Sequence, residues 1–523
     1  MRPPNLSFAE ADWGAAIAAL ADTDFLGPVA ATRRIRTAQA GGGIGAGRPA
    51  MPALTRLNAA MAQRFTGIAT SPVPVLLPFD VEALLRDQAA GTADDSSARY
   101  LAGFHAAQFF YAGPAGYDAA FAIRTADVAG LSDIPFSRPI EVQISGSLVL
   151  YNLDPPIAVA GSPVPELEHE FPGIRRMILE HYLRYTFVRF GVPYAVSALC
   201  FDAGVSREGL PTCRTADRVV QHFLRALQMA GGMPSGLRAI KPLPVERPAA
   251  VSTTFGYHAP GRILSGSGSR KRAGRTDFTV YSQIRFPLAD APASAGSELL
   301  GGGRGETRPG IDEPLSYSWR DNFCERRSFP VAQCPAGTGH QGQDIRALQC
   351  KIAPGTERCE QYGEVVAVRG GIILRSPKQE AAYLFVNSAN EHIRFRYLHM
   401  SPRKMDADGL LSGRRVHEGE VIGEVGNFSM QDAGTSYHLH FDIQVPTKDG
   451  WVFVNPYMTL VAAYERLIGA RGTELADPVA VDSAASGSGS DAASSSAKAS
   501  RTDGEKRRPR KSEKPARHRN GKR

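Results

Sequence analysis

Two histidines lie one residue apart in the segment SYHLHFDIQV, residues 436–445. Its alternation of apolar and polar residues predicts a β-strand, whose side chains point to opposite faces in turn. His438, His440, Asp442 and Gln444 then share one face, and apolar residues line the other. Imidazole and carboxylate groups placed together can bind a metal ion or transfer protons. Two histidines on the solvated face of an edge strand are the simpler explanation of this segment taken alone.

A second segment, GTGHQGQDIRA, places His340 and Asp344 four residues apart. Both a helix and an extended segment bring residues at this spacing to one side. The neighbouring Gly339 and Gly342 favour an extended loop over a helix. A neutral imidazole and a carboxylate on one side are suitable ligands for a divalent metal ion.

A third segment, HIRFRYLHM at residues 392–400, shows the alternation of another strand. His399 ends the apolar face of this strand, which is an unusual place for a histidine that merely faces solvent. His392 falls on the opposite face beside two arginines, and we expect it at the surface. His417, in the turn of VHEGEVIG, receives no role.

These segments follow one another in an order that resembles a known family. HQGQDI, RYLHM, VHEGEVIGEVG and YHLHFDI together resemble the lysostaphin-type, or LytM-like, zinc endopeptidases, which cut peptide cross-links in bacterial peptidoglycan. The resemblance covers residues 276–460 of the chain. The combination of HxxxD with HxH is specific when the intervening Tyr-x-His and glycine-containing turns are also present, as they are here.

The resemblance implies that His340, Asp344 and His440 bind one zinc ion per chain. It implies that His399 and His438 are catalytic or stabilise the transition state, and it leaves the division of these tasks open. Three protein ligands leave a fourth position to water, and Zn²⁺ lowers the pKa of bound water to about 7. One histidine can take a proton from that water, and the other can stabilise the developing oxyanion.

Two points around this predicted site remain open. Asp442 either orients a ligand as a hydrogen-bond acceptor or is exposed to solvent. Four cysteines, in NFCERRSFPVAQC and CKIAPGTERC, flank the segment that contains His340 and Asp344. We expect them to cross-link the loops on either side of it through disulfides. A separate cysteine-rich zinc site competes with this interpretation, but the spacings are far from CxxC pairs.

The alternative function is that of a non-catalytic relative, which binds the cell wall or activates a hydrolase.

The elements that position the predicted site are short strands. Nearly every segment between Gly363 and Pro456 is predicted to be a strand, and so is DFTVYSQIRFPL, residues 277–288. GSELLGGGRGETRPG is predicted to be a mobile insert, and a helix is expected within residues 456–470. We therefore expect a mostly antiparallel β peptidase domain at residues 276–466. The resemblance implies that this LytM-like domain has a duplicated hybrid motif-type β fold.

Residues 1–240 resemble no family and are predicted to form an α+β accessory domain. Short strands are expected within residues 72–154, after a helical, alanine-rich start. Residues 171–191 carry apolar residues at spacings of three and four and are predicted to be an amphipathic helix. A second helix is predicted from TADRVVQHFLRALQMAGG, with Thr215 as its N-cap and Gly231 after its end. We expect this domain to position the peptidase or to cover its groove.

A linker is expected at residues 241–275 and a disordered tail at residues 480–523, because neither composition can bury enough apolar surface. Residues 501–523 hold 11 Lys or Arg and 3 Asp or Glu, which equals the formal net charge of +8 of the whole chain. We expect this basic run to contact anionic polymers or a membrane surface in a salt-sensitive way. No aromatic residue interleaves it, which argues against nucleic-acid binding.

Six cysteines fall into three local pairs, which favours disulfides and an oxidising compartment over buried free thiols. The order along the chain suggests Cys200 with Cys213, Cys324 with Cys334, and Cys350 with Cys359, but six cysteines allow 15 pairings and the sequence leaves the connectivity open. No segment is long and apolar enough to be a transmembrane helix, and the N-terminus lacks the pattern of a signal peptide. The expected substrate and the cysteines nevertheless favour an extracytoplasmic location, in the periplasm or cell envelope of a bacterium.

Overall fold

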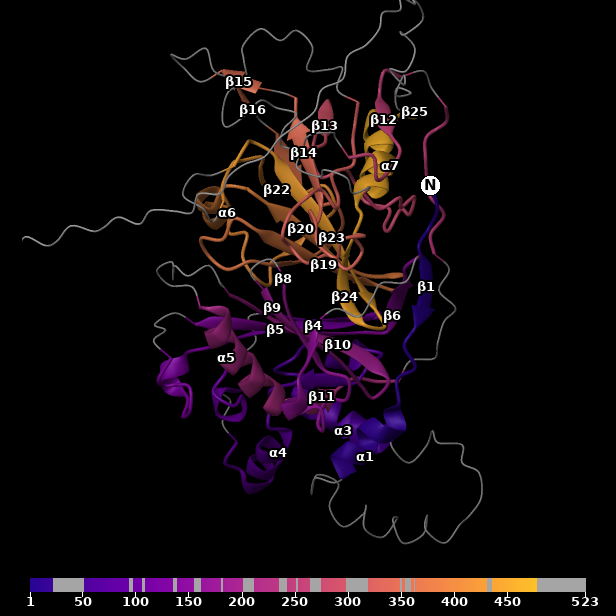
Figure 1. Cartoon of the computed structure of the whole chain (residues 1–523). Helices are drawn as coiled ribbons and strands as arrows, with labels where there is room; N and C mark the ends of the chain where they lie inside the picture. The colour runs from indigo at the N-terminus through magenta and orange to yellow at the C-terminus, as the bar shows by residue number, and fades with distance from the viewer. Residues whose placement is uncertain are drawn as a thin grey trace, which may run out of the picture. The chain divides into compact units, whose positions relative to one another are not determined.

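The computed structural model describes most of the chain up to residue 476. The described ranges are 1–21, 51–93, 97–105, 109–134, 139–154, 161–179, 182–200, 211–234, 242–250, 253–263, 274–297, 318–348, 350–352, 359–361, 363–429 and 435–476. They belong to one compact unit, Met1–Ala476 (Figure 1). The expected tail and most of the expected mobile insert lie outside the described residues, and the boundary at residue 240 stays a prediction.

A seven-stranded antiparallel sheet forms the centre of the first half (Figure 1), with the strand order β3-β4-β5-β10-β9-β8-β7. Its strands are β3 (Phe109–Gly113), β4 (Gly116–Ile123), β5 (Ile140–Ser147), β7 (Ser162–Pro163), β8 (Arg175–Leu179), β9 (Tyr182–Arg189) and β10 (Val192–Leu199). Two further pairs are β2 (Val75–Leu77) with β11 (Gln228–Gly231), and β1 (Asn5–Phe8) with β6 (Val149–Asn152). The strands expected within residues 72–154 are therefore confirmed.

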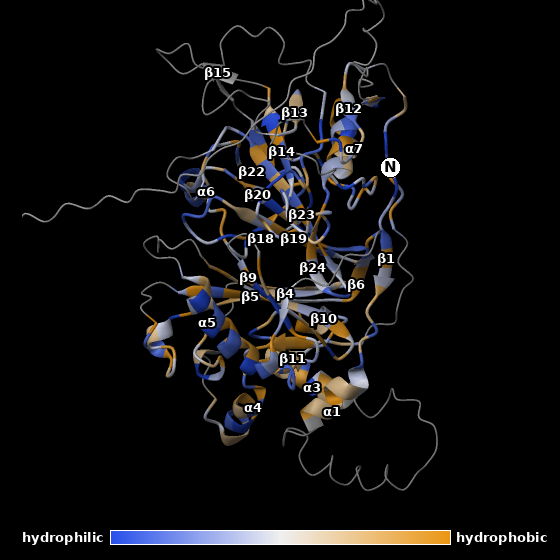
Figure 2. Ribbon diagram, in the orientation of Figure 1, coloured by the Kyte–Doolittle hydropathy of each residue, from blue (hydrophilic) through white to orange (hydrophobic). Residues whose placement is uncertain are grey.

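Helices line one side of this sheet in Figure 1. They are α1 (Trp13–Ala21), α3 (Met51–Met61), α4 (Val81–Ala90) and α5 (Cys213–Arg225). The helix α5 packs against β5, β9 and β10 through buried apolar residues such as Val219 and Phe223, and hydrophilic residues face outward (Figure 2). Its N-cap is Thr212, whose side chain accepts a hydrogen bond from the Thr215 amide, so the predicted cap was wrong by one turn. Gly231 lies in β11 and does not end this helix.

The helix predicted for residues 171–191 is wrong, because this segment forms the antiparallel pair β8–β9. In β9, Leu183, Tyr185 and Phe187 alternate and are buried in the core of the first half. The intervening Arg184 is also buried, against the second half of the chain, so a hydrophilic residue does not mark its face as solvent-exposed. Burial on both faces of β9 hid the period of two there, and the spacings of three and four were coincidental.

The second half contains an eight-stranded sheet with the order β13-β14-β23-β20-β19-β18-β21, and β24 pairs with β23. Its strands are β13 (Ala293–Ala295), β14 (Gln343–Ala347), β18 (Gly371–Leu374), β19 (Ala382–Ser388), β20 (Glu391–Leu398), β21 (Arg415–Val416), β23 (Leu439–Thr447) and β24 (Gly450–Val454). Three smaller pairs are β12 (Gly256–His258) with β25 (Thr473–Leu475), β15 (Cys350–Ile352) with β16 (Cys359–Gln361), and β17 (Glu364–Val366) with β22 (Val421–Glu424). Only β12–β25 among these described pairs is parallel, so the mostly antiparallel sheet is confirmed. The duplicated hybrid motif stays a prediction.

Two helices accompany this sheet: α7 (Tyr457–Ile468), as expected, and α6 (Pro402–Ala407), which the sequence did not predict. No described residue of 277–288 belongs to a named strand, which contradicts the prediction. The backbone groups of this segment instead form hydrogen bonds with separate parts of the chain. The Val280 amide donates to Arg2 O, and the Tyr281 amide donates to Thr459 Oγ1. None of the described helices combines the length and apolarity needed to cross a membrane.

Two of the three expected disulfides are confirmed, Cys200–Cys213 and Cys324–Cys334. The third expected pair lies at opposite ends of β15 and β16, whose backbones are paired, but both side chains lie outside the described part of the chain. The two confirmed bonds close loops with sequence separations of 13 and 10 residues. The second loop precedes the first predicted metal segment.

The polar face of β20 and β23 packs against the sheet of the first half. His392, which was expected at the surface, is 1% exposed, so this prediction is wrong. Its Nε2 lies 2.8 Å from Asp118 Oδ2 in β4, and Arg394 Nη2 donates to the other oxygen of Asp118 at 3.0 Å. Arg184 of β9 donates to Gln444 Oε1 at 3.1 Å. Alternation along β20 separated the two faces correctly, but the polar face meets protein instead of water.

Candidate metal centre

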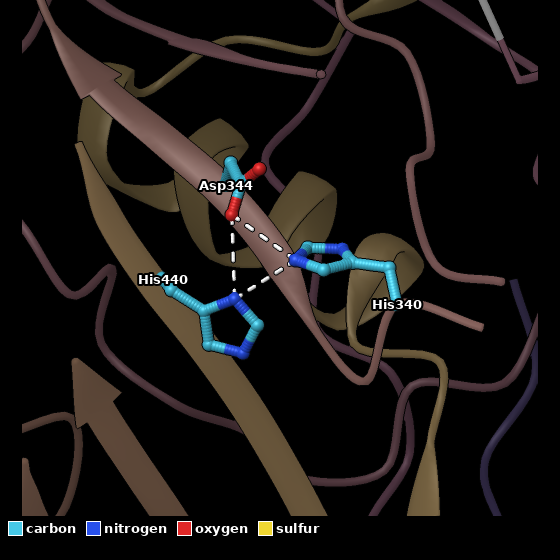
Figure 3. A group of neighbouring side chains, drawn as sticks. All are labelled: His340, Asp344 and His440. Atoms are coloured by element: carbon cyan, nitrogen blue, oxygen red, sulfur yellow. Dashed lines mark hydrogen bonds and ion pairs between the residues drawn. The ribbon is translucent and has the colours of Figure 1, made fainter. Parts of the chain in front are cut away.

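His340, Asp344 and His440 converge on one point between β14 and β23 (Figure 3). In the antiparallel register Asp344 is directly opposite His440, and directly opposed residues point to the same face. His340 lies in the extended segment before β14, and all three side chains are buried. A Cβ on Gly342 would lie 2.4 Å from Phe441 O and 2.8 Å from His440 Nε2, so only glycine permits this close approach.

The spacing of the three donor atoms fits a small cation. His340 Nε2 lies 2.9 Å from His440 Nδ1, and Asp344 Oδ1 lies 3.3 Å from each of them. A tetrahedral zinc site with bonds of about 2.0–2.1 Å separates its ligand atoms by about 3.3 Å. The buried Asp344 Oδ1 has no conventional hydrogen-bond partner, a costly state that a bound cation relieves.

The outward atom of each of these side chains faces a polar partner. His340 Nδ1 donates to the carbonyl oxygen of Asn322 at 3.0 Å, which leaves the Nε2 lone pair directed at the centre. Asp344 Oδ2 accepts a hydrogen bond of 2.8 Å from Asn322 Nδ2. His440 Nε2 faces Asp442 Oδ2 at 3.3 Å. Outer partners of this kind fix the ring orientation and tautomer of metal-binding histidines.

Asp442 is fully buried, so the solvent-exposed alternative for this residue is excluded. Arg396, directly opposite Asp442 in the register of β20 and β23, donates through Nε to the same carboxylate oxygen. Arg396 Nη2 also donates to Gln341 Oε1 at 3.0 Å, next to His340 in the chain. One buried guanidinium therefore links the segments that supply two of the three converging side chains.

The charges of the centre favour a cation. Burial alone would lower the pKa of His440, but the carboxylates of Asp344 and Asp442 outweigh it and raise the pKa to about 9. Burial alone would raise the pKa of Asp344, but the imidazoles of His340 and His438 outweigh it and hold the pKa well below its usual range. The carboxylates that stabilise a proton on His440 also stabilise a metal ion in the same space.

His399 lies beside this centre, although alternation placed it on the apolar face. The strand β20 ends at Leu398, and His399 adopts a left-handed φ of 71°, so alternation no longer applies. Its ring lies 4.7 Å from the ring of His438 and 6.2 Å from that of His440. The Nδ1–H donates to Phe428 O at 2.6 Å. Burial and the two neighbouring histidines hold the pKa of His399 well below its usual range, so its imidazole is neutral at pH 7.

His438 completes the group. Its Nδ1 lies 2.8 Å from the carbonyl oxygen of Ser436, and its Nε2 lies 3.4 Å from Asp344 Oδ1. The structure thus brings together all five residues that the sequence selected. His417, to which we gave no role, is exposed just before a turn.

A buried His–Asp–His group on an antiparallel sheet, with two further histidines beside it, defines a candidate hydrolytic metal centre. A comparison with protein families agrees: residues 339–456 match peptidase family M23, and this part of the chain is a domain of that family. The matched segment encloses all five selected residues, and the resemblance inferred from the sequence is confirmed. The centre is therefore part of a peptidase domain.

Among solved structures, the chain is similar to a protein from Ruminococcus gnavus assigned as a glycyl-glycine endopeptidase, LytM. The identity is 23%, the similarity covers 26% of this chain and 49% of that chain, and the TM-score is 0.18. The chain spans about half the length of that protein. No curated protein matches the chain.

Proposed function

We propose that this protein is a zinc metalloendopeptidase that hydrolyses peptide cross-links of bacterial peptidoglycan, with one zinc ion held by His340, Asp344 and His440. The observation that carries this proposal is the set of three buried donor atoms, 2.9 and 3.3 Å apart. The outer atoms of His340 and Asp344 are hydrogen-bonded to Asn322, and that of His440 faces Asp442. Membership of residues 339–456 in peptidase family M23 supports hydrolysis of peptide bonds.

The two remaining histidines supply proton transfer and charge stabilisation. Zinc, when bound, supplies a Lewis acid that polarises the scissile carbonyl and makes water nucleophilic near neutral pH. His399 is neutral and has an unprotonated Nε2, because its Nδ1–H is held by Phe428 O, so it can accept a proton from the attacking water. His438 directs Nε2 toward the centre while its Nδ1 lies against Ser436 O, so its protonated imidazole can donate from Nε2 to the oxyanion that develops on the substrate.

The substrate class rests on the resemblance of the motifs to lysostaphin-type enzymes. Peptidoglycan lies outside the cytoplasm, so we propose an extracytoplasmic site of action. The two disulfides agree with such a compartment. The basic run at residues 501–523 adds a salt-sensitive attraction to anionic polymers of the cell envelope.

Substitution of either flanking histidine tests the proposed chemistry. The variants His399→Ala and His438→Ala are expected to keep zinc but to lose about 10²–10⁴-fold in kcat, the usual contribution of a positioned acid or base. Release of new amino groups from purified peptidoglycan measures the rate, and elemental analysis of the dialysed protein measures the zinc.

The exposed His417 offers a matched control, because His417→Ala removes the same side chain at a position outside the centre. It is expected to leave both zinc content and rate unchanged. Undiminished cleavage by both His399→Ala and His438→Ala would contradict the assigned roles. A wild-type chain that binds zinc but never cleaves peptidoglycan would favour the non-catalytic alternative.

A further inference from the structure

Asn322 contacts two of the three converging side chains at once, and it lies outside the segment matched by the family. It precedes His340 by 18 residues and is 1% exposed. Its Nδ2 donates to Asp344 Oδ2 at 2.8 Å, and its Oδ1 accepts from the Asp344 amide at 3.2 Å. Its own carbonyl oxygen accepts from His340 Nδ1 at 3.0 Å.

These bonds determine which atoms face the centre. The amide group of Asn322 holds Asp344 at its backbone and at Oδ2, which turns Oδ1 toward the two imidazoles. The carbonyl oxygen can only accept, so it requires the proton of His340 on Nδ1 and leaves a lone pair on Nε2. One residue therefore fixes both the carboxylate orientation and the imidazole tautomer.

Asn322 is itself held by the segment that follows it. The Cys324 amide donates to His340 O at 2.9 Å, and the His340 amide donates to Glu325 O at 2.8 Å. The disulfide between Cys324 and Cys334 anchors the same segment two residues after Asn322. The backbone N–H of Asn322 donates to Gln343 Oε1 at 3.1 Å. The side chain is therefore preorganised before any ion binds.

We propose that Asn322 is a positioning residue of the metal centre, which sets the zinc affinity and the coordination geometry through Asp344 and His340. This inference rests on the proposed function, because it requires the centre to bind zinc. Loss of an outer hydrogen-bond partner typically lowers metal affinity by about 10–100-fold. Substitution of Asn322 removes its two side-chain bonds to Asp344 but keeps the backbone carbonyl that accepts from His340, so we expect a loss within this range.

The test compares Asn322→Ala with the full-length wild-type chain. Zinc affinity is measured by competition with a chromophoric chelator, and the geometry by the visible absorption of the Co²⁺-substituted protein. Asn322→Ala is expected to bind zinc about 10–100-fold more weakly and to show a shifted Co²⁺ spectrum. A purely structural role for Asn322 would leave the spectrum of the folded, cobalt-loaded protein unchanged.

Asn58 provides a matched control in the first half of the chain. It is a buried asparagine with the same kind of bonds, since Nδ2 donates to Gly232 O at 2.8 Å and Oδ1 accepts from the Gly232 amide at 3.0 Å. Asn58→Ala is expected to lower thermal stability without any change in zinc affinity. A comparable loss of zinc affinity in both variants would overturn the proposal.

A second variant keeps the test valid if Asn322→Ala does not fold. Asn322→Asp keeps the volume and the acceptor for the Asp344 amide but replaces the Nδ2 donor with a second carboxylate oxygen facing Asp344 Oδ2. It is also expected to weaken zinc binding at least 10-fold. Zinc affinity within twofold of wild type in either folded variant would refute the role of Asn322 and leave the proposed function standing. A wild-type chain that binds no zinc would instead refute the proposed function.

Discussion

Replacement of His340 by alanine is expected to abolish both zinc binding and the hydrolysis of peptidoglycan. The variant keeps only two of the three proposed ligand atoms, Asp344 Oδ1 and His440 Nδ1, which lie 3.3 Å apart. Loss of a direct ligand should weaken zinc binding by more than about 100-fold, the upper limit for losing an outer partner alone. Metal ions supply several kcal/mol of transition-state stabilisation, so the rate should fall by at least about 10³-fold.

Two measurements check this expectation. Elemental analysis after dialysis against a chelator gives the zinc content of each variant, and digestion of purified peptidoglycan gives the rate. Wild type stripped by the chelator should lose activity and regain it when zinc is added, whereas His340→Ala should not respond. His417→Ala, at an exposed position, should behave as wild type. Cleavage that survives both the substitution and chelation would exclude the proposed mechanism.

Four of the five central residues carry local signals, because His438 and His440 share one strand and Asp344 lies four residues after His340. That these two pairs and His399 meet at one centre was implied only by the resemblance to the lysostaphin-type enzymes. The sequence could not place His399 correctly, because a left-handed φ at the end of β20 interrupts the alternation. Such a backbone conformation is uncommon for a residue other than glycine, and the sequence carries no sign of it.

The outer partners of the centre lay beyond prediction for a different reason. Asn322 belongs to a segment without a motif, and its contacts with His340 and Asp344 depend on how a disulfide-closed loop folds back. Arg396 did carry a signal: it is a charged residue on an otherwise strand-like segment, directly opposite Asp442. That pairing becomes visible only when the register of β20 and β23 is known.

The fold was predictable where the two faces of a strand differ in polarity, as in β20 and β23, whose alternation is clear although both faces are buried. It was less predictable in β8 and β9, where apolar residues fall on both faces and the pair was taken for a helix. His392 was predicted at the surface because its neighbours in β20 are arginines, but this strand is buried on both faces. Sequence patterns report polarity, and polarity does not distinguish water from a buried polar interface.

Asp118 lies in the buried polar interface between β4 and β20, and Asp118→Ala is expected to destabilise the whole compact unit. Asp118 is 1% exposed, and its two oxygens bind His392 Nε2 at 2.8 Å and Arg394 Nη2 at 3.0 Å. Removal of the carboxylate leaves a buried guanidinium without its anionic partner, which typically costs about 3–5 kcal/mol. Urea denaturation of the full chain, followed by tryptophan fluorescence, measures the loss. The exposed Asp133–Arg218 pair supplies the control, because Asp133→Ala should cause little measurable change.

The pH dependence of the stability lost in Asp118→Ala shows whether the Asp118 carboxylate is responsible for that loss. Burial alone would raise the pKa of Asp118, but His392 and Arg394 outweigh it and lower the pKa in the folded protein. A lowered folded-state pKa stabilises the fold fully above the ordinary aspartate pKa of about 3.9, and the effect fades as the pH falls through the folded value. The difference in unfolding free energy between wild type and Asp118→Ala should therefore narrow as the pH falls below about 4 and Asp118 takes up a proton in the folded protein. A small gap at pH 7, or one that does not narrow in acid, would mean that apolar contacts hold the two halves together.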